Sequence, residues 1–130
     1  MGTLNFEISI IDQPLAISRF GPKDPIPAWV YTSDIFSITR TQDELSIISD
    51  ERKTPGDIVC EKGWAGLKLE GIFAFELTGV LASVITPLST NGISIFAMST
   101  YNTDYILVKS SQLNQAILVL QKEGHYILKR

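Results

Sequence analysis

The sequence predicts an α+β protein, with a β-rich first half and a second half in which strands and two helices alternate. Two observations support this fold class. In the first half, hydrophobic residues repeat with a period of two, which indicates strands with one buried face. In the second half, the repeat changes twice to the three-and-four spacing of an amphipathic helix. Hydrophobic residues make up 45% of the 130 residues and charged residues 19%, which is typical of a packed core.

The first half contains four predicted strands. Residues 4–10 alternate most clearly, and residues 16–20 are expected to form a hairpin with them. A proline-rich loop and at most one helical turn follow. Residues 34–40 alternate again, and residues 45–48 form a short strand. Residues 50–63 are polar, so we expect residues 1–62 and 63–130 to form two halves that pack on each other.

The second half begins with a strand from Leu67 to Phe75. A helix should follow, because apolar residues stand at i, i+3, i+4 and i+7, namely Leu81, Val84, Ile85 and Leu88. Asn91-Gly92 is typical of a helix C-terminus. Pro87 conflicts with this helix, since proline removes a hydrogen bond or bends the axis.

Two strands, 93–100 and 105–109, should form the next hairpin. A second helix then carries one apolar face, made of Leu113, Ala116, Ile117 and Leu120, and Gly124 ends it before a last strand at 126–128. The order βαββαβ is that of the ferredoxin-like arrangement, with both helices on one face of the sheet. The other face would be covered by the first half or by a second subunit.

Charge and hydropathy exclude several classes of partner. A net charge of −3 and a pI near 5.0 give no electrostatic basis for binding nucleic acid. The longest nearly apolar stretch, residues 80–88, is far shorter than the ~20 residues of a membrane span. The single cysteine, Cys60, fits a reducing compartment, and no secretory signal is evident, so a cytoplasmic location is expected.

The second half also resembles a known family. Residues 76–82, Glu-Leu-Thr-Gly-Val-Leu-Ala, resemble the opening of an ACT domain, although Thr78 stands where that family usually has proline. Residues 77–83 and 92–109 resemble a small bacterial ACT family of about this length. Residues 99–104 are similar to a segment of the vertebrate cytosolic arginine sensors, and aspartokinase regulatory domains are more distant relatives. The first half is similar to a degenerate ACT-like unit, which implies a tandem pair.

The resemblance implies a ligand site in two segments, consisting of Glu76, Leu77, Thr78, Gly79, Val80, Met98, Ser99, Thr100, Tyr101, Thr103 and Asp104. A helix N-terminus at Gly79 would suit the carboxylate of an amino acid. The carboxylates of Glu76 and Asp104 would suit its ammonium or a guanidinium, and Tyr101 could cover its stem. Each residue also has a local interpretation: Asp104 as a turn residue, Glu76 as a charge at a helix start, Gly79 as a tight turn and Tyr101 as an ordinary aromatic.

Catalytic and metal chemistry find little support in the sequence. His125, the single histidine, lacks ligand-spaced neighbours and is expected on the surface, and no phosphate-binding loop or cofactor motif occurs. A Cys60–His125 nucleophile pair lies outside any motif, so an enzyme is the weakest hypothesis. No metal and no cofactor are expected.

The leading hypothesis is a regulatory module that binds an amino acid or similar metabolite as its small-molecule ligand. It would report that ligand to an unidentified regulated protein. The alternative is a dimerisation or assembly module without a ligand. A homodimer is expected under either hypothesis, because an uncovered sheet edge favours pairing.

Overall fold

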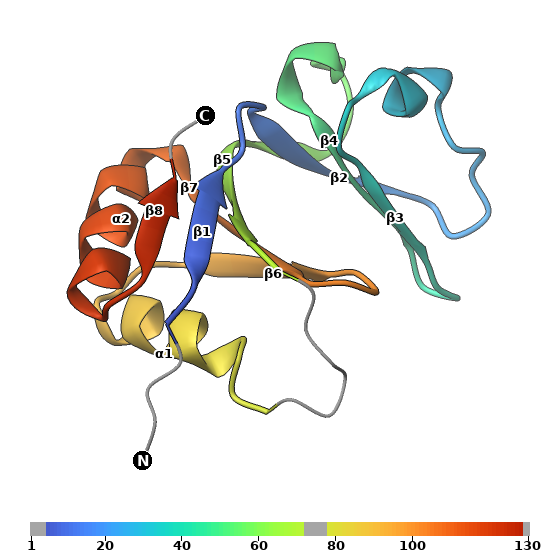
Figure 1. The fold of residues 1–130 in the computed structure, drawn as a ribbon. Helices are drawn as coiled ribbons and strands as arrows, with labels where there is room; N and C mark the ends of the chain where they lie inside the picture. The colour runs from blue at the N-terminus through green and yellow to red at the C-terminus, as the bar shows by residue number, and fades with distance from the viewer. Residues whose placement is uncertain (1–4, 72–77, 129–130) are drawn as a thin grey trace. The chain divides into compact units, whose positions relative to one another are not determined.

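The computed structural model describes residues 5–71 and 78–128, and its fold is α+β, as predicted (Figure 1). Contacts within the chain define two compact units. One, here called the helical unit, comprises Met1–Asp12 and Ala65–Arg130; the other, here called the β unit, comprises Gln13–Trp64. The β unit is therefore inserted between the first strand and the rest of the helical unit. This differs from the predicted division, which kept residues 1–62 together.

The first strand lies inside the sheet of the helical unit. β1 (Glu7–Ile10) pairs antiparallel with β5 (Cys60–Leu69) and parallel with β8 (Tyr126–Leu128). On the other side, β5 pairs with β7 (Asp104–Lys109), which pairs antiparallel with β6 (Ile95–Ser99). The order in this unit is β8-β1-β5-β7-β6. The predicted hairpin between residues 4–10 and 16–20 is therefore wrong, because β1 takes both of its partners from the second half of the sequence.

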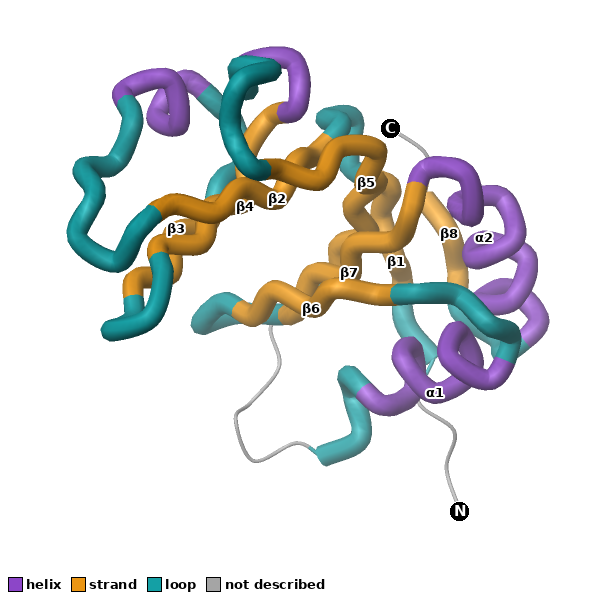
Figure 2. The backbone as a smooth tube through the Cα atoms, turned by 180° about the vertical axis from the view of Figure 1, so that it is seen from behind, coloured by secondary structure: helices purple, strands orange, loops and turns teal. Residues whose placement is uncertain are grey.

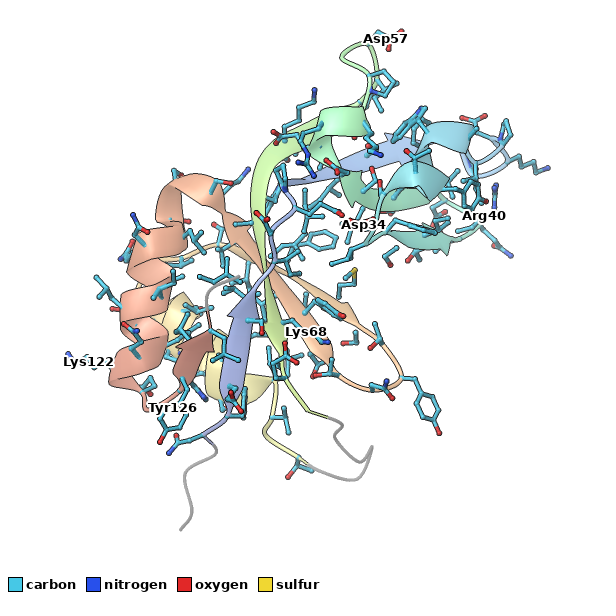
Figure 3. The ribbon with its side chains drawn as sticks, turned by 45° about the horizontal axis from the view of Figure 1, so that its top comes forward. Asp34, Arg40, Asp57, Lys68, Lys122 and Tyr126 are labelled. Atoms are coloured by element: carbon cyan, nitrogen blue, oxygen red, sulfur yellow. The ribbon has the colours of Figure 1, made fainter. Side chains whose placement is uncertain are left out.

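Two helices cover one face of this sheet. α1 (Ala82–Thr90) and α2 (Leu113–Lys122) lie side by side (Figure 2). Their apolar residues join those of the strands in one buried cluster: Ile8, Leu67, Leu69, Val80, Val84, Leu88, Ile93, Ile106, Val108, Ala116 and Leu120. Lys122, at the end of α2, points away from the sheet (Figure 3). The periodicity of both helices, and their placement on one face, are confirmed.

Both helices end with the same hydrogen-bonded motif. After α1, Gly92 has a φ of 75°, and the N–H of Ile93 donates to the carbonyl oxygen of Leu88 at 3.0 Å. After α2, Gly124 has a φ of 96°, and the N–H of His125 donates to the carbonyl oxygen of Leu120 at 3.1 Å. This is the Schellman arrangement, in which the residue after the glycine packs back on the helix. Ile93 and His125 are consequently both buried.

His125 resolves the conflict posed by Pro87. It is 4% exposed, so the prediction that it lies on the surface is wrong. The N–H of Phe6 donates to its Nδ1 at 3.4 Å, which leaves Nε2 as the protonated nitrogen, and Nε2 lies 3.2 Å from the carbonyl oxygen of Ser83. Pro87 stands four residues after Ser83 and has no N–H to donate to that carbonyl. His125 therefore supplies the hydrogen bond that the proline removes, and α1 continues through Pro87.

The β unit contains strands and short turns. β4 (Leu45–Asp50) pairs antiparallel with β2 (Leu15–Phe20) and β3 (Ser37–Arg40), and β2 also pairs with the first residues of β5. Two 3₁₀ turns, Ala28–Thr32 and Glu51–Lys53, complete it. The predicted strands and the single helical turn are present. A small cluster of Val30, Leu45 and Ile47 is buried, with Phe20, Ile26, Trp29 and Ile38 packed against it.

Buried polar side chains hold the loops of the β unit. The Gln13 side chain, which is 5% exposed, accepts from the N–H of Ile35 at 3.1 Å and donates to the Ile35 carbonyl oxygen at 2.9 Å. The hydroxyl of Ser33 accepts from the N–H of Asp50 at 3.0 Å. These bonds give partners to backbone groups that are partly buried at Ile35 and buried at Asp50.

Candidate functional site

The first candidate segment is the turn that opens α1. Gly79 has a φ of 81°, a left-handed conformation that glycine adopts without strain, so the sequence needs glycine here. Thr78 and Gly79 are exposed, whereas Val80 is buried in the core of the helical unit. The N–H of Ser83 donates to the Gly79 carbonyl oxygen at 3.0 Å, which starts the helical bonding.

The start of α1 has the properties of an anion-binding end. The hydroxyl of Ser83 donates to the carbonyl oxygen of Val80 at 2.6 Å, and no side chain caps the helix. Within the described residues, no acceptor pairs with the N–H groups of Val80, Leu81 and Ala82. Unpaired N–H groups at a helix N-terminus, together with the helix dipole, favour a negatively charged group such as a carboxylate.

The second candidate segment is the turn that joins β6 to β7. The N–H of Thr100 donates to the carbonyl oxygen of Thr103 at 2.8 Å, and the Thr100 hydroxyl donates to the same oxygen at 3.0 Å. The N–H of Thr103 in turn donates to the Thr100 hydroxyl at 3.3 Å. Three hydrogen bonds between two threonines thus fix this turn, which explains why threonines flank Tyr101 and Asn102.

Asp104 stands opposite Ser99 in the ladder between β6 and β7. The Ser99 hydroxyl donates to Oδ1 of Asp104 at 2.6 Å. Among the described residues, Oδ2 of this half-buried carboxylate has no hydrogen-bond or ionic partner. The serine therefore orients the carboxylate and leaves one oxygen able to accept a hydrogen bond from a cationic group.

Thr103 connects this turn to the strand that leads toward α1. Its hydroxyl is buried and donates to the carbonyl oxygen of Leu69, the last residue of β5, at 2.5 Å. Residues 72–77 connect the end of β5 to Thr78, and the predicted site residues Glu76 and Leu77 lie outside the described residues. The turn between β6 and β7 is therefore hydrogen-bonded to the end of β5, a few residues before the other predicted site residues at positions 76–80.

The remaining predicted residues differ in their exposure. Met98 is buried, so its side chain contributes to packing. Tyr101 is 80% exposed at the tip of the turn. In the described part of the chain, no hydrogen bond joins the turn to Thr78–Val80. The structure therefore brings Ser99, Thr100, Thr103 and Asp104 together, and the grouping of both segments into one site stays a prediction.

His125 was missed as a structural residue, and both of its ring nitrogens are engaged with backbone groups. It consequently has no ring nitrogen left to accept a proton from the Cys60 thiol. Its position directly after Gly124 was the signal that could have revealed its burial, because the residue following a Schellman glycine packs on the helix.

The described residues also bear on metal binding and on membrane insertion. No group of three or more histidine, cysteine, aspartate or glutamate side chains in residues 5–71 and 78–128 is arranged to hold a metal ion. In the same part of the chain, no helix is long and apolar enough to cross a membrane.

Comparisons with known proteins match both parts of the sequence. A family model described as an ACT domain matches residues 59–122, and a model for an N-terminal domain matches residues 14–57. The human cytosolic arginine sensor for mTORC1 subunit 1 is 31% identical over 99 residues, which cover 68% of this chain. The chain spans only 30% of the length of that relative.

Solved structures share the fold. A crystal structure of a protein from Agobacterium tumefaciens has a TM-score of 0.92 and 40% identity, covering 98% of this chain and 95% of the other. The regulatory subunit of aspartate kinase from Thermus thermophilus has a TM-score of 0.66 at 11% identity, covering 90% and 96%. The latter likeness shows the fold alone. The chain therefore belongs to the ACT-domain family, with the ferredoxin-like α+β fold and relatives among the arginine sensors.

Proposed function

We propose that this chain is a regulatory module that binds an amino acid at the turn between β6 and β7 and the start of α1. The observation that carries the proposal is the Asp104 carboxylate, which Ser99 orients through one oxygen while the other has no partner among the described residues. A carboxylate held in this way suits an ammonium or guanidinium group. The N-terminus of α1 would receive the ligand carboxylate.

The relatives support the same class of function. One is named a cytosolic arginine sensor, and another is named the regulatory subunit of aspartate kinase. By analogy we propose a cytosolic, non-catalytic role, in which the ligand alters the contacts of this chain with a regulated protein. Glu76, Leu77 and Tyr101 remain proposed members of the site.

A thermal-shift screen against the twenty amino acids tests this proposal. A ligand at a hundred times its dissociation constant should stabilise the folded state by about 2.7 kcal/mol. We expect one or a few amino acids to raise the melting temperature, and the rise to disappear in Asp104→Asn. The matched control is Asp43→Asn, which removes an exposed carboxylate from a turn of the β unit. Equal shifts in wild type and Asp104→Asn would contradict the proposed position of the site.

The alternative is a dimerisation module without a ligand. The observation in its favour is that the turn is hydrogen-bonded within itself. Two threonines and the Ser99–Asp104 pair already satisfy most of its polar groups without a ligand. In that case no amino acid would shift the melting temperature, and sedimentation would show a dimer whose mass is unchanged by ligands. A homodimer that also binds an amino acid would favour the sensor.

A further inference from the structure

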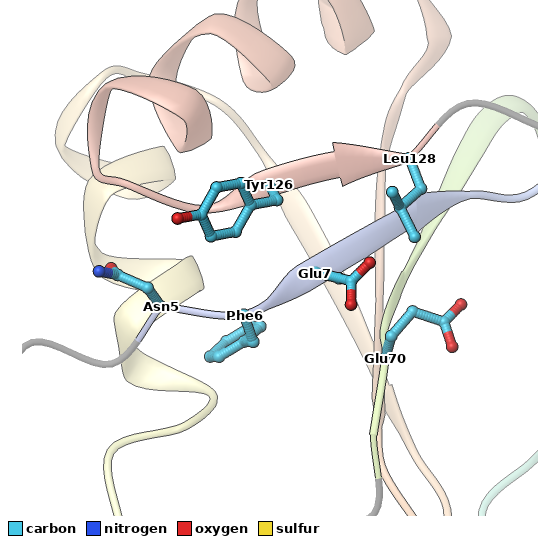
Figure 4. Close-up of a pocket in the computed structure, with 6 residues that line it drawn as sticks. All are labelled: Asn5, Phe6, Glu7, Glu70, Tyr126 and Leu128. Carbon is cyan, nitrogen blue, oxygen red and sulfur yellow. The ribbon is translucent and has the colours of Figure 1, made fainter.

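A hollow of about 590 Å³ opens beside β1, β5 and β8 of the helical unit (Figure 4). Its lining consists of Asn5, Phe6, Glu7, Glu70, Tyr126 and Leu128. Glu7 and Tyr126 are register partners across β1 and β8, and the N–H of Glu70 donates to the Glu7 carbonyl oxygen at 2.9 Å. All of these residues belong to one compact unit. The hollow thus depends on the strand order in which β1 lies between β5 and β8.

The hollow lies on the face of the sheet that the helices do not cover. Ile8 belongs to the core beneath α1 and α2, and adjacent side chains of a strand point to opposite faces. Glu7 therefore points to the other face, and its partner Tyr126 accompanies it. Figure 4 shows Glu7 between Leu128 and Glu70 in this view. The volume falls within the range of about 300–1,000 Å³ that small-molecule sites occupy.

The two carboxylates beside the hollow differ in their contacts with the described residues. Oε1 of Glu70 lies 3.6 Å from Nζ of Lys68, and the Ser9 hydroxyl donates to Oε2 of Glu70. Glu70 is thereby oriented and compensated. Among the described residues, the Glu7 carboxylate has no hydrogen-bond or ionic partner. The Glu7 carboxylate therefore supplies a negative charge that complements a single positive charge on a ligand.

The walls beside Glu7 are aromatic and aliphatic. Tyr126 is 66% exposed and Leu128 is 37% exposed, so both present apolar surface to solvent. The face of a tyrosine ring attracts a cation electrostatically, and a leucine side chain can cover an alkyl stem. A charged head and an apolar stem would therefore each find a matching surface a short distance apart.

We propose that this hollow binds a small organic monocation, with a guanidinium or ammonium head on a short alkyl stem. The head pairs with the Glu7 carboxylate, and the stem lies against Leu128 and the Tyr126 ring. Because no group in the lining requires a carboxylate on the ligand, this site is independent of the amino-acid site proposed at Asp104. It would recognise a decarboxylated amine or guanidine as well as a free cationic side chain.

The test is a titration of the ¹⁵N-labelled chain with n-butylguanidinium, followed by amide chemical shifts. This probe has the head and stem of the proposed ligand but no carboxylate. Shifts are expected at residues 5–7, at Glu70 and at residues 126–128. Glu7→Gln should weaken the affinity about tenfold or more, because a hydrogen bond to a charged group is lost. Asp57→Asn, an exposed residue of the β unit, is the charge-matched control and should leave the affinity unchanged.

Three results would overturn the proposal. The first is equal affinity of wild type and Glu7→Gln, whose spectrum also reports whether the variant is folded. The second is an absence of shifts at these amides, or shifts confined to the turn at Thr100–Asp104. The third is that n-butanol causes the same amide chemical-shift changes as n-butylguanidinium, which would show that the hollow recognises the alkyl stem and not the charge. Failure here leaves the amino-acid screen at Asp104 unaffected, since the two experiments use different ligands and variants.

Discussion

The helical unit and the β unit stabilise themselves by different means. The helical unit buries a continuous apolar cluster between two helices and a sheet. The β unit has a much smaller described cluster and relies on buried side chains that bond backbone groups, such as Gln13 to Ile35 and Ser33 to Asp50. Without helices to cover its strands, the β unit must satisfy loop backbone groups by side chains.

The difference predicts which kind of substitution each unit tolerates least. Loss of apolar volume should be most costly in the helical unit, and loss of a polar side chain should be most costly in the β unit. Unfolding measured by amide hydrogen exchange can follow the two units separately, since stability varies within a chain.

The largest effect is expected from Leu120→Ala. Leu120 is fully buried on α2, so its truncation should cost about 2–5 kcal/mol and accelerate amide exchange in the helical unit. Leu118→Ala, on the same helix but 67% exposed, is the matched control and should change stability by about 0.5 kcal/mol or less. Similar losses of stability in Leu120→Ala and Leu118→Ala would mean that the buried face of α2 does not contribute more to the core than its exposed face.

The next effect is expected from Gln13→Met, which keeps the size of the side chain but removes both hydrogen bonds to Ile35. Losing two hydrogen bonds to these partly buried backbone groups, each worth about 0.5–1.5 kcal/mol, should cost about 1–3 kcal/mol. In Gln13→Met, we expect faster hydrogen exchange of the Ile35 amide and little change in the exchange of amides in the helical unit. This result would strengthen the distinction between the two units. Gln42→Met, in an exposed turn, is the control. An unchanged urea midpoint for Gln13→Met would contradict a polar basis for the stability of the β unit.

A double-mutant cycle tests whether His125 replaces the hydrogen bond lost at Pro87. His125→Phe should destabilise the protein by about 1–3 kcal/mol, because the Ser83 carbonyl and the Phe6 N–H lose their partners. In a Pro87→Ala background, the N–H at position 87 can bond Ser83 directly. The cost of His125→Phe should then fall by about 1 kcal/mol. Strictly additive effects would show that the two residues act independently.

The smallest effect concerns pH and the β unit. The side-chain hydrogen bond from Arg52 is the main reason that the pKa of Asp50 lies below its ordinary value of 3.8. The resulting stability is present at neutral pH and is lost as the pH falls from that value through the lowered folded-state pKa. Arg52→Met should remove it, at a cost of about 1 kcal/mol or less, since Arg52 is largely exposed. If the urea midpoints of wild type and Arg52→Met changed by the same amount between pH 7 and pH 3, the Asp50–Arg52 pair would not be the source of this pH-dependent stability.

Local features of the fold could be predicted, and long-range ones could not. The helices followed from apolar spacing, and their ends followed from Asn91-Gly92 and Gly124. Alternation in residues 4–10 revealed a buried face but not the partners of the strand, because pairing with β8 joins residues 119 apart, as between Phe6 and His125.

Prediction of the candidate sites from the sequence was limited in the same way, to residues that are close along the chain. Residues close in sequence, from Ser99 to Asp104, form a bonded turn as their spacing suggested. The hollow beside Glu7 draws on three strands distant in sequence, so alternation alone could not assemble it. His125 carries no periodic signal, and the local sign of its burial was its position directly after Gly124.

The position of β1 has a consequence for synthesis of the chain. Because β1 leaves the ribosome before the β unit and β8 leaves after α2, the sheet that contains both cannot close until residues 126–128 have emerged. At about 5–20 residues per second, the first strand waits several seconds for its neighbours while the whole β unit emerges and can fold. The apolar side of that strand, with Ile8 and Ile10, is the surface a chaperone would encounter first during this interval.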